Sequence, residues 1–68
     1  MDNIDVRKYI IGNFKDSNIE ELKSSIADSI TSGDDDPLIG LGVLFEILWK
    51  NSSLKEQEII LNNIKKGM

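Results

Sequence analysis

Apolar residues recur every three or four positions along most of the chain, which is the spacing of one face of an α-helix. In the clearest stretch the apolar positions are Ile19, Leu22, Ile26 and Ile30. Ser17 and Glu20 have the spacing of a capping box, in which each side chain accepts a hydrogen bond from the other residue's backbone amide. Gly33 stands where a left-handed residue would end the helix. The pattern predicts a helix over residues 18–32.

An earlier helix is predicted over residues 3–13. Its apolar positions are spaced four apart, with Tyr9 and Ile11 beside them: Val6, Ile10 and Phe14. Asp2 or Asn3 can cap its N-terminus, and Asp5 would lie in the first turn, where a negative charge favours the helix dipole. The apolar run over residues 9–11 is also compatible with a strand.

The third predicted helix, over residues 37–50, is apolar on almost every side. Asp36 is the expected N-cap and Pro37 the first helical residue. The non-apolar stripe is narrow and consists of Gly42, Glu46 and Lys50, the last two in the favourable order for an ion pair. A helix of this composition belongs at the centre of a bundle or across an interface between chains.

Two glycines in this helix, Gly40 and Gly42, cost about 1 kcal/mol each relative to alanine. Close approach of a neighbouring backbone would offset that cost. The broader apolar side of the helix is its candidate functional surface, either core or interface, and is called the apolar stripe below. Its residues are Leu41, Leu44, Phe45, Leu48 and Trp49.

A fourth helix is predicted over residues 54–66, starting with a second capping box formed by Ser53 and Glu56. Its buried face would carry Ile60, Leu61 and Ile64, and its last turn holds Lys65 and Lys66. Four short helices with short connections predict a compact all-α bundle, a single domain over residues 1–68 with the third helix at its centre.

The apolar segment lacks residues that a membrane span, a nucleotide-binding loop or a calcium site would require. Thirteen residues between Asp36 and Lys50 are too few to cross a membrane, which takes about twenty. A phosphate loop would need lysine where Val43 stands, and a dinucleotide fingerprint would need a third glycine in place of Phe45. The spacing from Asp35 to Glu46 fits a calcium loop, but prolyl and isoleucyl side chains fill positions that need oxygen ligands. No metal, cofactor or small molecule is therefore expected.

Composition restricts function further. The chain has no histidine or cysteine, so Ser24 and Ser25 lack an imidazole to activate them, and catalysis is not expected. The 8 basic and 12 acidic residues leave a net charge of -4 and form no basic cluster, which disfavours nucleic acid as a partner. The acidic N-terminus does not resemble a signal peptide, so an intracellular protein is expected.

One string is more specific than composition: Gly40, Leu41, Gly42, Val43, Leu44, Phe45 and Glu46, followed by Trp49. With Ser32-Gly33 and the acidic loop before it, this string resembles the signature of the small acid-soluble spore protein I family, minor proteins of bacterial endospores. The likeness continues upstream through Arg7, Ile11, Asn13, Glu20, Leu22, Ile26, Asp28 and Ile30. The family pattern has proline directly before the first glycine, where this chain has Ile39 and carries its proline at Pro37.

The resemblance implies synthesis in the developing spore and residence in the spore core, and it implies no mechanism. The major spore proteins of similar name coat DNA, but this sequence does not resemble theirs. The expected function is a non-enzymatic protein of the spore core, forming a homodimer through the third helix. Two alternatives remain: an interaction module that binds another protein through the apolar stripe, and a DNA-associated spore protein, which the acidic charge disfavours.

Overall fold

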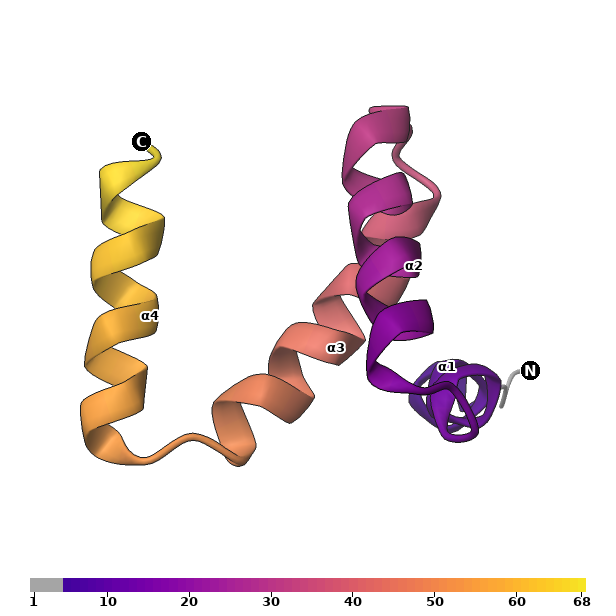
Figure 1. The fold of residues 1–68 in the computed structure, drawn as a ribbon, viewed down its shortest axis with the longest axis horizontal. Coiled ribbons are helices and arrows are strands. Elements are labelled where there is room, and N and C mark those ends of the chain that lie inside the picture. The colour runs from indigo at the N-terminus through magenta and orange to yellow at the C-terminus, as the bar shows by residue number, and fades with distance from the viewer. Residues whose placement is uncertain (1–4) are drawn as a thin grey trace.

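The computed structural model describes residues 5–68, and all regular secondary structure in that range is helical (Figure 1). The four helices are α1 (Val6–Phe14), α2 (Ile19–Ser32), α3 (Pro37–Lys50) and α4 (Leu54–Lys66). The all-α fold predicted from the sequence is therefore confirmed. Residues 9–11 lie inside α1, so the alternative of a strand there is wrong.

Helix α1 starts later than expected. Asp5 has an extended backbone, and its carboxylate accepts a hydrogen bond of 3.1 Å from the amide of Lys8. Asp5 is thus the N-cap and not part of the first turn, because an N-cap residue must leave the helical conformation for its side chain to reach the free amides. The other two proposed caps, Asp2 and Asn3, lie outside the described residues.

Helix α2 has the expected capping box, shifted by one residue. The amide of Glu21 donates to Asn18 Oδ1 at 2.8 Å, and the amide of Asn18 donates to Glu21 Oε1 at 3.0 Å. The predicted pair of Ser17 and Glu20 is wrong because the Ser17 amide already donates to the carbonyl of Phe14 in the turn after α1. At the other end Gly33 has φ 70, the left-handed conformation expected of it.

The N-termini of α3 and α4 differ. Pro37 opens α3 as predicted, but Asp36 has helical dihedral angles and makes no side-chain cap hydrogen bond. With Asp36 already in the helical conformation, its carboxylate cannot reach back to the first amides. Helix α4 has the predicted box, in which the Glu56 amide donates to Ser53 Oγ at 3.1 Å and the Ser53 amide to Glu56 Oε1 at 2.7 Å. The bond from the Ser53 amide lowers the pKa of Glu56.

The packing is uneven along the chain. Helices α1 and α2 both pack against α3, whereas α4 makes few contacts with the other helices. Figure 1 shows α2 and α4 on opposite sides of α3, with α4 linked to α3 by a short turn. Across this turn Gln57 Nε2 donates to the carbonyl of Trp49 at 3.0 Å. The bundle is therefore less compact than the sequence pattern suggests.

Burial is shallow. Within the described range Val43 is the single buried apolar residue, with 7% of its surface exposed. Leu38 and Ile39 on the same helix are exposed. Helix α3 is the element on which α1 and α2 pack, but its burial at the centre of a bundle stays a prediction.

The two helix glycines do not have the close backbone neighbour expected of them. A Cβ atom built on Gly40 would lie 3.8 Å from Ile10 Cδ1, an ordinary contact with a side chain. A Cβ atom built on Gly42 would meet nothing within 4 Å. Packing among residues 5–68 therefore does not require glycine at either position.

Candidate functional site

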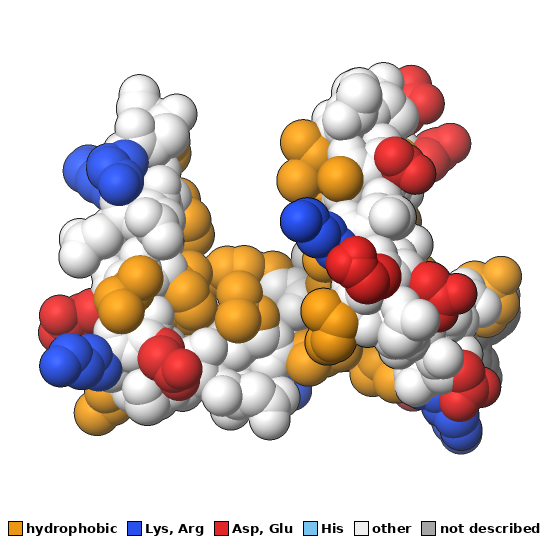
Figure 2. All heavy atoms as spheres, in the orientation of Figure 1, with side chains coloured by type: hydrophobic (Ala, Val, Ile, Leu, Met, Phe, Trp, Pro, Cys, Tyr) orange, Lys and Arg blue, Asp and Glu red, His pale blue; other side chains and the backbone are white. Residues whose placement is uncertain are grey.

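The apolar stripe of α3 is only partly covered by the rest of the chain. Phe45 has 40% and Leu48 has 48% of its surface exposed, while Leu41, Leu44 and Trp49 are half-buried. Figure 2 shows hydrophobic side chains lining the hollow between α2 and α4. The stripe is therefore not fully buried by its own chain, and its exposed apolar surface is one that another protein can cover.

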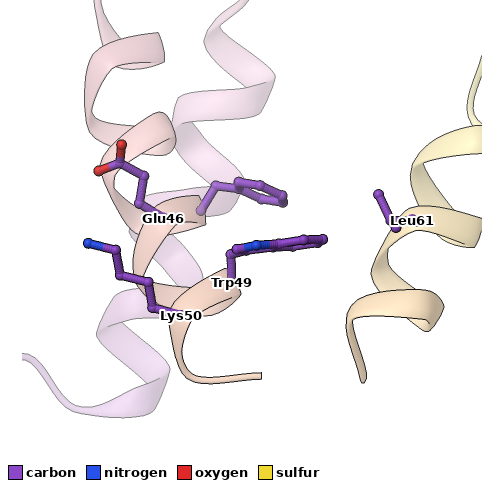
Figure 3. A pocket seen from close by; sticks show the side chains of 5 residues that line it. Glu46, Trp49, Lys50 and Leu61 are labelled. Carbon is purple, nitrogen blue, oxygen red and sulfur yellow. The ribbon is translucent and has the colours of Figure 1, made fainter. Parts of the chain in front are cut away.

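Two clefts bring the stripe residues together with residues of the flanking helices. The first, about 430 Å³, lies between α2 and α3 and is lined by Leu22, Ile26, Leu41, Leu44, Phe45, Ile47 and Leu48. The second, about 260 Å³, lies between α3 and α4 and is lined by Phe45, Glu46, Trp49, Lys50 and Leu61 (Figure 3). Phe45 borders both clefts. Together these linings form one continuous surface, called the apolar groove below.

Two aromatic rings form the middle of the groove. Phe45 and Trp49 lie one turn apart on α3, with ring centroids separated by 6.0 Å and planes inclined by 27°. Such pairs contribute about 0.5–1.5 kcal/mol beyond the area they bury. In Figure 3 the Trp49 ring points across the cleft toward Leu61 of α4. The α3 side of the groove therefore consists of two stacked aromatic rings, whereas α4 contributes Leu61 to its lining.

One ion pair, at the edge of the smaller cleft, joins α3 to α1. Arg7 Nε donates to Glu46 Oε1 at 2.7 Å, and a second guanidinium nitrogen donates to Glu46 Oε2 at 2.9 Å. This bidentate pair lowers the pKa of Glu46, chiefly through the hydrogen bonds from Arg7, and raises the pKa of Arg7 for the same reason. Two parallel hydrogen bonds between a guanidinium and a carboxylate fix the relative orientation of the two helices in addition to the attraction between the charges.

The sequence assigned the wrong partner to Glu46. Lys50, one turn along α3, was expected to pair with it, but Lys50 only adds a weak attraction that lowers the pKa of Glu46 further. Arg7 lies 39 residues away along the chain. The one sequence signal at Arg7 was its place among the positions that resemble the spore family, and that signal carries no information on distance.

Other kinds of site find little support in the part of the chain that is described. Residues 5–68 contain no group of three or more acidic side chains placed to hold a metal ion. No helix in the same range combines the length and the hydropathy needed to cross a membrane. The groove, with its almost wholly apolar lining, is the feature best suited to binding protein.

Comparison with known proteins gives a consistent result. The model of the family described as "Small, acid-soluble spore protein I" matches residues 4–68. A protein of that name from Halalkalibacterium halodurans is 38% identical over 66 residues, covering 97% of both chains.

Two further relatives carry the same name. The one from Bacillus subtilis is 37% identical over 65 residues, covering 96% of this chain and 92% of the relative. The one from Bacillus cytotoxicus is 35% identical over 66 residues, covering 97% and 94%. No solved structure matches the chain.

Proposed function

Because the chain belongs to the small acid-soluble spore protein I family, we propose that it is a non-enzymatic minor protein of the bacterial spore core, made during sporulation. The observation that carries this proposal is the family match over residues 4–68, which leaves almost no part of the chain outside it. The non-enzymatic part is supported by chemistry. With no histidine or cysteine, the chain has neither the usual general base nor a thiol nucleophile.

Mass spectrometry tests the location and timing. Dilute-acid extracts of purified spores and of growing cells are compared for peptides of this chain. The protein is expected in spores and absent from growing cells. Equal abundance in growing cells would contradict the proposed role, and recovery from the spore coat fraction would contradict the core location.

The molecular role that we propose is association with protein, first of all with a second copy of the same chain. The support for it is the exposed part of the apolar stripe at Phe45 and Leu48, which a monomer leaves in contact with water. Burial of apolar surface is the main favourable term in most protein association. Light scattering over a range of concentrations tests this role, and the expected mass is twice that of the 7.6 kDa chain.

A second candidate is an interaction module that binds a different protein through the same stripe. The same exposure at Phe45 and Leu48 supports it. The two candidates differ in what covers the stripe, so a stable dimer disfavours the open groove that a different partner would need. A monomer that is captured from spore extract only when the stripe is intact would favour the second candidate.

Association with DNA is the least supported role. The net charge of -4 opposes the neutralisation of phosphates that drives most nucleic-acid binding. A gel shift at low salt is expected to show no complex. A shifted band that disappears as salt is raised would overturn this expectation, since a salt-dependent complex is the signature of phosphate contacts.

A further inference from the structure

We propose that the apolar groove is the docking site for helix α4 of a second copy of this chain, and that each copy in a two-fold dimer inserts its α4 into the groove of the other. The inference rests on the proposed self-association and specifies its geometry. Three observations support it: the surface area of the chain, the exposed face of α4 and the distribution of charge.

The chain exposes more surface than a folded monomer of its size should. Its accessible surface is 5881 Å², whereas the scaling of area with mass gives about 4300 Å² for 7.6 kDa. The excess is about 1600 Å² by that scaling. Subtracting the most that any four residues can expose, roughly 700 Å², still leaves roughly 900 Å² for the described part of the chain. A stable interface of standard size takes about 800 Å² from each partner, so the excess suffices for one.

Helix α4 provides an apolar face that its own chain covers only in part. Ile60, Leu61 and Ile64 follow the three-and-four spacing of one helix face, and Leu61 and Ile64 are exposed. An isolated helix of this length is marginal in water, so most of its stability has to come from packing. Within its own chain α4 has the Gln57 hydrogen bond and one side of the smaller cleft. A second chain that buries this face would supply the missing packing.

Charge favours the same pairing. Helix α4 carries three lysines and two glutamates, which gives it a net charge of +1. Residues 5–50 carry nine acidic and five basic side chains, a net charge of -4. Docking α4 of one copy on α2 and α3 of another therefore joins a helix of net charge +1 to two helices whose net charges are -2 and 0. Docking of α2 on α2 would instead bring two acidic helices together.

A closed dimer follows from symmetry. A two-fold arrangement uses the same surfaces on both copies, so the α4 face and the groove are each filled once and no groove is left open. This matches the amount of surface available, because each copy contributes both a helix and a groove. A head-to-tail arrangement that did not close would give filaments instead.

Analytical ultracentrifugation of three full-length chains tests the docking. Wild type is compared with Ile64→Glu on the docking face and with Ile59→Glu on the opposite face of α4. The exposures of these two isoleucines are similar, 44% and 55%, so the substitutions differ mainly in the face they affect. Wild type and Ile59→Glu are expected to form dimers with dissociation constants within about threefold. Ile64→Glu is expected to raise the dissociation constant at least tenfold, as loss of an interface anchor does.

Cross-linking gives a second measurement that does not depend on a destabilising charge. The natural chain has no cysteine, so a single introduced cysteine can be linked only to another copy. Leu48→Cys in the groove, labelled with ¹⁵N, is mixed with unlabelled Ile64→Cys or Ile59→Cys and treated with a short bismaleimide. The mixed product with Ile64→Cys is expected to exceed the product with Ile59→Cys several-fold.

The possible outcomes distinguish the docking of α4 from the proposed self-association on which it rests. A wild-type chain that stays monomeric at every concentration overturns both self-association and this docking. A dimer that persists in Ile64→Glu, with equal cross-linking at positions 64 and 59, leaves self-association standing and overturns the docking. Loss of the dimer in Ile59→Glu alone would place the interface on the other face of α4 and would also overturn it.

Discussion

Helices α2 and α4 are built alike and placed differently. They have 14 and 13 residues, each begins with a complete capping box, and each has an apolar face of similar strength. Yet α2 packs along α3, whereas α4 meets α3 only near the turn that joins them. Caps and periodicity determine that a helix forms and which face is apolar. What that face packs against is decided by contacts far along the chain, or on another chain.

The largest effect should come from the one buried position, which belongs to the packed part of the molecule. Val43→Asp would place a carboxylate in the buried contact between α1 and α3 and is expected to lower the free energy of unfolding by about 3–5 kcal/mol. Urea unfolding followed by circular dichroism measures it. The matched change Ile39→Asp, at an exposed position of the same helix, should cost less than about 1 kcal/mol. Equal losses would mean that Val43 is not a core residue.

Trp49→Ala should have the next largest effect, because Trp49 stands where the packed part meets α4. A fully buried tryptophan would lose about 3–5 kcal/mol on truncation. Trp49 is only half-buried, so a loss of about 2 kcal/mol is expected in thermal unfolding. Trp49→Phe keeps an aromatic ring against Phe45 and should retain much of the stability that Trp49→Ala loses. A loss above 4 kcal/mol in the dimer but not in the monomer would show that a second copy completes the burial.

Gly42→Ala should stabilise the chain modestly. A methyl group at this position meets nothing within 4 Å, and alanine is favoured over glycine inside a helix by about 1 kcal/mol. The thermal midpoint should therefore rise, with Gly33→Ala as a contrasting change that strains a left-handed residue and lowers it. If Gly42→Ala weakens the dimer, a second backbone approaches Gly42 and the groove is not the main interface.

The smallest effect should be the pH dependence of the pair between Arg7 and Glu46, which is exposed to solvent. Because the pair lowers the pKa of Glu46, its contribution is present above the ordinary glutamate value of 4.5 and is lost as pH falls through the lowered pKa. Wild type should thus unfold at a higher temperature than Glu46→Gln at pH 7. The gap should shrink below pH 4.5 and close in stronger acid. Glu58→Gln on α4, which removes one negative charge and leaves the pair intact, serves as the charge control.

The sequence predicted what is local. It placed three of the four helices within one residue, found the box of Ser53 and Glu56, and identified the left-handed Gly33. The first box was misplaced by one residue because both Ser17 and Asn18 are good caps. The turn after α1, which the periodicity does not reveal, uses the amide of Ser17.

The sequence did less well on contacts between helices. Glu46 had an evident partner one turn away, and nothing in the spacing pointed to Arg7 on another helix. Likewise, an apolar helix is expected to be buried, but periodicity does not say whether its own chain is long enough to bury it. For the stripe at Phe45 and Leu48, the chain covers only about half of each side chain.

The contacts of this chain also bear on how fast it matures. Nearly all of them join residues close in sequence, and the pair between Arg7 and Glu46 is one of the few that close a long loop. Helical proteins with such local contacts fold in microseconds to milliseconds. Assembly of subunits is slower and depends on concentration. The packed part of a newly made chain, α1 to α3, should therefore fold long before the chain meets a partner, so the rate of its synthesis would determine when the grooves close.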